Sequence, residues 1–240
     1  MHGSRVGHHQ ERVIRMLGNA GETELDLRFQ LFGIPVRVHP LFWLMAAFFV
    51  WDAHRLDLVF IGILCVFVSI MIHELGHAVM FRRFGHRGEI VLYLAGGFAT
   101  GGRLSTWRNI IVSAAGPIAG FLLAAIVWGI VVALRNYSPA TLSEHQVVTY
   151  ALSNLLFINI WWGVLNLMPC IPLDGGHIMQ SLVLRYLPRR AEIRVLWISI
   201  LSSGAVALWA VPYQRRFLMI VFGLLCAKHV ITLNQRRQFR

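Results

Sequence analysis

The sequence predicts an all-α polytopic membrane protein with about six transmembrane helices and one short re-entrant β-like hairpin. Three features support this fold class: the composition, the lengths of the apolar runs, and one glycine-rich apolar segment that is too short to span. The 240 residues are 57% hydrophobic and only 14% charged, whereas soluble domains have about 45–50% apolar and about 25% charged residues. This excess indicates a membrane protein and not a soluble domain with a large core.

Six apolar runs approach the length needed to cross a bilayer, which is roughly 20 helical residues. His39 and Pro40 interrupt the first run. The fourth runs into Pro169, where we expect the helix to break before a short continuation over residues 177–187, because proline cannot continue the hydrogen-bonding pattern of a helix. The predicted spans are residues 35–51, 58–81, 109–134, 148–170, 193–211 and 216–233.

The basic residues predict the orientation of these spans. Six spans place both termini on one side, and all but four of the 22 lysines and arginines fall in segments on that side. The exceptions are Arg55, Arg135, Arg215 and Arg216. By the positive-inside rule that side is cytoplasmic, so the net charge of +11 orients the protein and does not indicate a nucleic-acid partner. We expect residues 1–30 to be a loosely ordered cytoplasmic tail and residues 31–240 to be the core, in the cytoplasmic membrane.

Residues 88–102, GEIVLYLAGGFATGG, do not fit a spanning helix. EIVLYL contains strand-favouring residues, and the glycines allow bends. Non-helical backbone at membrane depth is tolerated only where protein or a water-filled cavity satisfies its polar groups. We therefore expect a short re-entrant hairpin beside a site, with an apolar surface loop as the alternative.

The acidic residues point to a functional centre inside the membrane. Of the 11 aspartates and glutamates, only Glu74 and Asp174 lie in strongly apolar surroundings. A charged side chain at the bilayer centre costs at least about 2.5–3.5 kcal/mol on insertion scales, so such residues are functional candidates by default.

Glu74 belongs to the motif HELGH, which lies near the end of the second predicted span. His73 and His77 are four residues apart, so on a helix they share one face with Cβ atoms about 5–6 Å apart. That spacing lets two imidazoles hold one metal ion, with Glu74 able to reach a metal-bound water without being a ligand. The alternative is a pair of histidines that hydrogen-bond between helices.

A catalytic zinc site usually has three protein ligands and a water, so two histidines leave it one ligand short. Asp174 is the candidate, because it is the other intramembrane carboxylate and follows a proline-interrupted helix. The glycines at 175 and 176 let the backbone bend close to the metal. His177 and Cys170 are the rival third ligands.

Together these motifs carry a resemblance. HELGH, followed about 90 residues later by NLMPCIPLDGG at residues 166–176, resembles the site-2 protease family of intramembrane zinc metalloproteases, peptidase family M50. GIPVRVHPLF from residue 33 is similar to the family's approach to its first helix. SAAGPIAG at residues 113–120 is similar to its third-helix motif, with Gly120 where many members have asparagine. The resemblance also implies a re-entrant β-element at residues 88–102.

The family implies a function and roles for residues in this chain. His73, His77 and Asp174 would hold one Zn²⁺ per chain, and Glu74 would be the catalytic base that assists attack by a zinc-bound water. The substrate would be a transmembrane protein in the lipid bilayer, cut in or near a transmembrane segment. Asn166 would bind substrate backbone or stabilise the oxyanion, and an interhelical hydrogen bond is an equally simple role for it.

A transmembrane helix must unwind to be cut. The edge of a strand in residues 88–102 is expected to hold the unwound segment by β-augmentation, with Val91 and Tyr93 as candidate contacts.

Many family members carry a PDZ or a CBS domain, and this chain has room for neither, so the resemblance implies a minimal catalytic core that is restrained by a membrane partner or by substrate access. Two alternatives belong to other functional classes: a metal-ion transporter, and a zinc-binding membrane protein that has lost hydrolysis. A transporter predicts polar residues strung along the spans, whereas here they cluster at one depth. Loss of hydrolysis would most simply remove Glu74, which is present.

Overall fold

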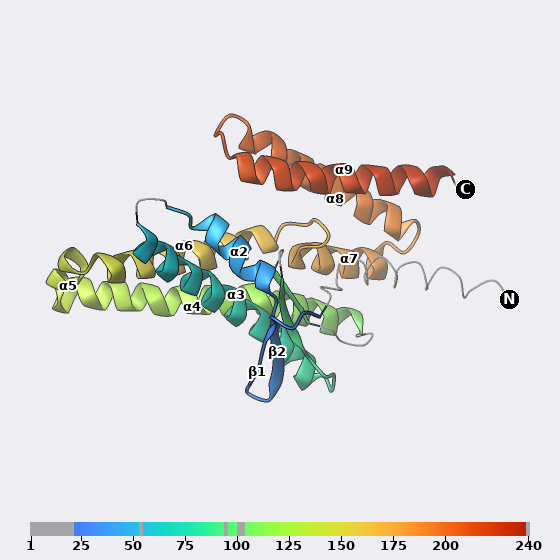
Figure 1. Ribbon diagram of the computed structural model, residues 1–240. Helices are drawn as coiled ribbons and strands as arrows, with labels where there is room; N and C mark the ends of the chain where they lie inside the picture. Colours follow the sequence, from blue (N-terminus) through green and yellow to red (C-terminus); the bar gives the residue numbers. More distant parts are fainter. Residues whose placement is uncertain (1–21, 53–54, 94–95, 100–103, 239–240) are drawn as a thin grey trace.

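The computed structural model describes residues 22–52, 55–93, 96–99 and 104–238. Helices dominate, and a small sheet lies beside them (Figure 1), which confirms the predicted fold class. The strands are β1 (Leu27–Leu31), β2 (Ile34–Val38), β3 (Ile90–Tyr93) and β4 (Gly96–Ala99). The helices are α2 (Pro40–Phe49), α3 (Leu56–Arg83), α4 (Thr106–Tyr137), α5 (Pro139–Glu144), α6 (Gln146–Asn166), α7 (Asp174–Tyr186), α8 (Ala191–Ala210) and α9 (Arg216–Gln238).

Five helices in the described part of the chain, α3, α4, α6, α8 and α9, are long and apolar enough to cross a membrane. The first predicted span, residues 35–51, differs from the prediction, because β2 occupies its start and α2 has only 10 residues. At 1.5 Å per residue α2 is about 15 Å long, half of a bilayer core. Pro40 begins the helix because the first helical N–H needs no partner, and the β-branched residues before it favour the strand.

The predicted break after the fourth span is confirmed. α6 ends at Asn166, and α7 begins only at Asp174. The intervening segment contains Pro169 and Pro172, which lack the N–H groups that a continuous helix would need.

The four strands form one sheet in the order β1-β2-β3-β4. β1 and β2 are antiparallel, β2 and β3 are parallel, and β3 and β4 are antiparallel. The predicted hairpin at residues 88–102 is therefore present as β3 and β4, with residues 94–95 and 100–102 outside the described part of the chain. β3 is paired on both sides, so the edge expected at Val91 and Tyr93 belongs instead to β4.

Strand β1 lies inside the stretch that the sequence analysis assigned to a loosely ordered tail. Arg37 of β2 donates to Asp26 across 3.0 Å, and the Thr23 hydroxyl donates to the same carboxylate across 2.6 Å. These hydrogen bonds lower the pKa of Asp26 to about 2, and the bond from Thr23 has the larger effect. Ordered structure therefore begins before residue 31.

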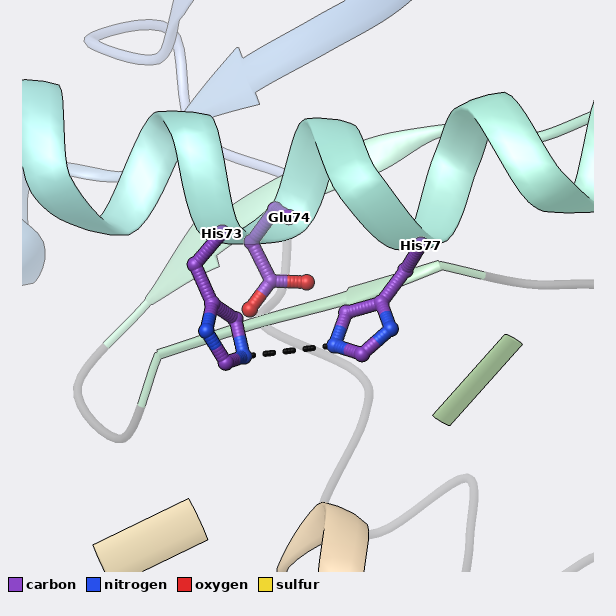
Figure 2. Close-up of side chains that lie close together, drawn as sticks. All are labelled: His73, Glu74 and His77. Atoms are coloured by element: carbon purple, nitrogen blue, oxygen red, sulfur yellow. Dashed lines mark hydrogen bonds between the residues drawn. The ribbon is translucent and has the colours of Figure 1, made fainter. Parts of the chain in front are cut away.

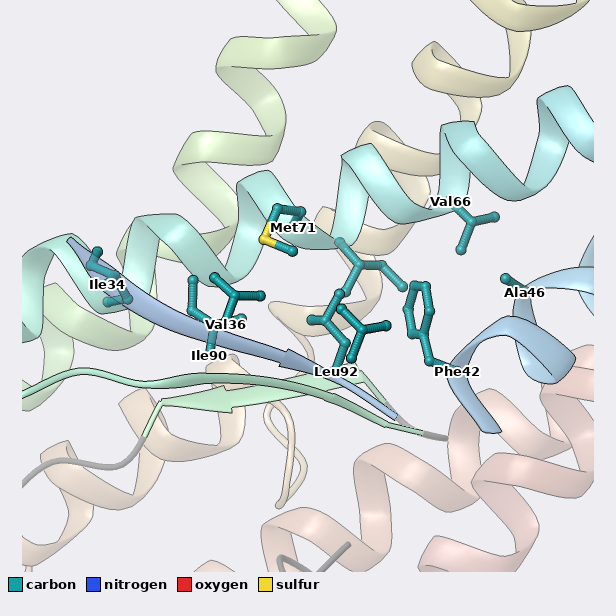
Figure 3. Close-up of a cluster of buried hydrophobic side chains, with 11 residues drawn as sticks. Ile34, Val36, Phe42, Ala46, Val66, Met71, Ile90 and Leu92 are labelled. Atoms are coloured by element: carbon teal, nitrogen blue, oxygen red, sulfur yellow. The ribbon is translucent and has the colours of Figure 1, made fainter. Parts of the chain in front are cut away.

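The largest buried apolar cluster joins the sheet to α2 and α3 (Figure 3). Alternating residues of β2 and β3 point into it, as the two-residue period of a strand requires, and α2 adds Phe42, which is fully buried. Its labelled members are Ile34, Val36, Phe42, Ala46, Val66, Met71, Ile90 and Leu92. This packing fixes the sheet against the half of α3 that carries HELGH.

The membrane helices form two groups (Figure 1). α3, α4 and α6 pack on one another, and α7 packs on α4. α8 and α9 lie side by side as a helical pair, and α8 also contacts α7. The segment from α6 through α7 therefore connects the group that carries HELGH to the α8–α9 pair.

Candidate metal centre

His73, Glu74 and His77 lie on one stretch of α3, and their side chains are directed to the same side (Figure 2). Their residues are only 4%, 4% and 7% exposed. One ligand atom from each lies within 4.8 Å of the others, and the two histidine Nε2 atoms are 3.2 Å apart. Because the two histidines are four residues apart, about one helical turn, their imidazoles lie on the same face of α3, as the sequence predicted.

Asp174 completes the cluster from α7. Its Oδ2 atom lies 3.1 Å from His73 Nε2, and its Oδ1 atom lies 3.3 Å from His77 Nε2. Asp174 is the first residue of α7, where the N-terminal end of the helix dipole favours a negative charge. The break between α6 and α7 thus places a carboxylate against two histidines from a helix about 100 residues earlier in the chain.

The spacing of these atoms matches a zinc ion. Zn²⁺ binds nitrogen and oxygen ligands at about 2.0–2.2 Å in a tetrahedron, whose edges are then about 3.3–3.6 Å long. The two Nε2 atoms are 3.2 Å apart, slightly less than such an edge, and the two carboxylate oxygens of Asp174 lie 3.1 Å from His73 Nε2 and 3.3 Å from His77 Nε2. In a catalytic zinc site of this kind, the fourth position would belong to a water or a substrate oxygen.

His77 is oriented by a backbone carbonyl. Its Nδ1–H group donates to Val112 O of α4 across 2.7 Å, because a carbonyl can only accept. In the neutral imidazole the lone pair then lies on Nε2, the atom that faces His73 and Asp174. An imidazole held in this way through its other nitrogen is the arrangement typical of a metal-ligating histidine.

Two glycines let α3 and α4 approach closely at this level. A Cβ atom at Gly76 would lie 2.4 Å from Ala115 O. A Cβ atom at Gly116 would lie 2.2 Å from His77 Nε2 and 2.8 Å from His73 Nε2. Small residues at a helix interface permit such contact between backbones in membranes, and here they leave the space in front of the ligand nitrogens open.

Among the described residues, neither rival of Asp174 forms a hydrogen bond with His73 or His77. His177 is exposed on α7, and the Cys170 thiol donates to Ile171 O. Asn166 ends α6, half-buried, and among the described residues its side chain makes no hydrogen bond, so its substrate role stays a prediction. The same holds for Val91 and Tyr93 as substrate contacts, although their strand is internal.

The sequence alone did not predict the contribution of α4 to this cluster. The motif SAAGPIAG does not by itself predict a role for Gly116 or for the carbonyl group of Val112. A run of small residues in a span indicates close helix packing. It does not show which side chain on the neighbouring helix the small residue faces.

Known proteins match this chain along much of its length. The model of the family described as Peptidase family M50 matches residues 61–208, more than half of the chain. A zinc metalloprotease of Methanocaldococcus jannaschii is 26% identical over 158 residues, which cover 65% of this chain and 44% of that protein. Stage IV sporulation protein FB of Bacillus subtilis is 27% identical over 189 residues, which cover 75% of this chain and 60% of that protein. The chain thus spans less than two thirds of the length of these relatives.

The structure is also similar to a solved one. The site-2 protease from Methanocaldococcus jannaschii superposes with a TM-score of 0.54 and 19% sequence identity. The match covers 87% of this chain and 95% of that chain. At this identity the likeness shows a common fold.

Proposed function

This chain belongs to peptidase family M50, and from that premise we propose that it is an intramembrane zinc endopeptidase that cuts membrane proteins in or near their transmembrane segments. The observation that supports this most strongly is the triangle of the residues His73, His77 and Asp174, with Glu74 beside it in a membrane helix. The two histidine Nε2 atoms are 3.2 Å apart, and each lies 3.1 or 3.3 Å from one oxygen of the Asp174 carboxylate. The cluster combines a metal-ligand set and a carboxylate base in an apolar setting.

The roles follow from the chemistry of the side chains. His73, His77 and Asp174 would hold the Zn²⁺ ion, which when bound lowers the pKa of water toward about 7 and polarises a carbonyl group. Glu74 would accept the proton of the attacking water and later deliver it to the leaving amine. The enclosing helices α3, α4 and α7 limit the water that reaches the reacting groups.

The basic ends of the helices gather on one side, which supports the proposed orientation. Arg82 and Arg83 end α3. Three contacts join neighbouring ends: Arg108 over the Phe84 ring, Arg185 over the Trp107 ring, and the ion pair of Arg236 with Glu192. By the positive-inside rule we place this side in the cytoplasm. His77 lies six residues before Arg83, about 9 Å along the helix, so the cut should fall toward the cytoplasmic leaflet.

The bound metal is the most direct test, and it needs no substrate. We expect one zinc per chain in detergent-purified protein. The Asp174→Ala variant and the His73→Ala/His77→Ala double variant should lose most of it, because each removes part of the triangle. Elemental analysis after dialysis measures this. A folded wild-type chain that holds no zinc after supplementation would overturn the proposal, and zinc retained without Asp174 would reassign the third ligand.

The open edge of the sheet is the proposed holder of an unwound substrate. β4 is an edge strand and packs beside α3, so a substrate strand can pair with it by β-augmentation. Neighbouring residues of an antiparallel strand direct their N–H groups to opposite sides. Of the two substitutions Gly97→Pro and Phe98→Pro, one therefore removes an N–H donor from the outer edge of β4. The other removes an N–H donor from the pairing of β4 with β3.

We expect the proline that removes the outer donor to lower cleavage of a transmembrane peptide while zinc content stays unchanged. Cleavage rate and zinc content are measured on both single variants. Cleavage at the wild-type rate in both would show that the substrate does not pair with β4.

A further inference from the structure

The segment between α6 and α7, residues 167–173, precedes the third ligand directly and is not helical. At membrane depth each of its backbone polar groups needs a partner within the protein. The N–H groups of Leu167, Met168, Cys170 and Leu173 donate to carbonyls of α6 or of the segment itself. The two prolines have no N–H group. The N–H of Ile171 is thus the one donor in this segment that takes its partner from a distant element.

That partner is a serine of α8. Ile171 N donates to Ser199 Oγ across 3.3 Å, and the Ser202 hydroxyl donates to Pro169 O across 2.9 Å. Ser199 is fully buried. Residues three apart lie on one face of a helix, so both hydroxyls meet the same stretch of non-helical backbone. α8 therefore supplies partners to backbone groups that the break in the helix leaves open.

The first turn of α7 confines the same segment from another direction. A Cβ atom at Gly175 would lie 2.1 Å from Leu167 O, and one at Gly176 would lie 2.4 Å from Cys170 O. The segment is therefore in backbone contact with α7 while α8 holds it by hydrogen bonds. A shift of Cys170 and Ile171 toward α7 would therefore push against the start of that helix, where Asp174 lies.

We propose that Ser199 and Ser202 are positioning residues of the metal centre. By holding the backbone of Pro169 and Ile171, they keep the Asp174 carboxylate against the histidines of α3. The α8–α9 pair then has a role in the site although it contributes no ligand. This inference rests on the proposed function, because it assigns the serines a role toward the zinc-binding carboxylate.

Position 202 offers a test with matched variants, because Ser202 is only partly buried. Ser202→Thr keeps the hydroxyl, whereas Ser202→Val has nearly the same shape and lacks it. We expect Ser202→Val and Ser199→Ala to weaken zinc binding about tenfold, the lower end of the effect of outer partners of metal ligands. Ser202→Thr should bind zinc like the wild type.

Zinc affinity is measured on the full chain by competition with a chelator, and the visible absorption of the Co²⁺-loaded protein reports the ligand geometry. Thr232→Val is the control, since the partly buried Thr232 hydroxyl donates to Lys228 O of its own helix, α9, and valine removes only that hydroxyl. It should leave both measurements unchanged.

Equal zinc affinity in Ser202→Thr and Ser202→Val would overturn the inference, because only the hydroxyl distinguishes them. If Ser199→Ala does not fold, the Ser202 pair decides alone. The two proposals fail differently: a wild-type protein without zinc refutes the protease assignment, whereas normal zinc binding in the wild type and in every serine variant refutes only the positioning role.

Discussion

Replacing Glu74 by glutamine is expected to abolish peptide-bond cleavage while the protein still binds zinc. Glutamine keeps the size of the side chain and a carbonyl oxygen, but it cannot accept a proton from water near neutral pH. General acid–base catalysis contributes about 10²–10⁴-fold to rates, so cleavage should fall by at least that range. The measurement is the rate of cleavage of a transmembrane peptide in proteoliposomes, together with the zinc content of the same preparation.

Glu144→Gln is the matched control. Glu144 is exposed at the end of α5, outside the site, so the same chemical change there should leave cleavage and zinc content as they are. If Glu74→Gln cleaved at the wild-type rate, Glu74 would not be the base. If it instead lost its zinc, Glu74 would be a ligand, and the roles of Glu74 and Asp174 would need to be reassigned.

Adding a single methyl group at Gly116 is expected to eliminate zinc binding. The new Cβ atom would lie 2.2 Å from His77 Nε2, about the length of a zinc–nitrogen bond, so it would occupy or border the position of the ion. The histidines cannot easily move away, because His77 is tied to Val112 O and α3 is in contact with α4 at Gly76. Zinc content and cleavage should both fall to background.

Gly129→Ala provides the control on the same helix, because a Cβ atom at Gly129 meets nothing within 4 Å. Alanine in place of glycine generally favours a helix by up to about 1 kcal/mol, so both variants gain the same helical preference. Thermal unfolding monitored with zinc content separates the two effects. A Gly116→Ala protein that is stable and holds zinc normally would show that the space in front of the histidines is not required.

The spans, the break and the two histidines follow from local features of the sequence. Long apolar runs specify membrane helices because backbone groups in lipid must be satisfied within the segment. Prolines end a helix wherever they fall. The HELGH spacing specifies which side chains share a face as soon as the segment is helical. These inferences need no knowledge of neighbouring elements.

The first predicted span and the N-terminal strands could not be predicted in this way, because their structure depends on distant parts of the chain. Residues 35–51 are apolar enough for a membrane helix, but residues 36–38 pair with β3, which lies more than 50 residues later. Strand formation depends on the partner that is available. Only the tertiary structure shows that β3 is the partner of β2. It also shows that β4, and not β3, carries the open edge.

By itself, the sequence determined that this protein is a membrane protein with two histidines and a glutamate close together on one helix, because those properties depend on composition and on spacing within one element. The tertiary structure decided which carboxylate meets the histidines, which glycine faces their Nε2 atoms, and which serines of α8 hydrogen-bond to the segment before Asp174. These contacts join residues 28 to 101 positions apart, and such approaches depend on how helices pack, which no local pattern specifies.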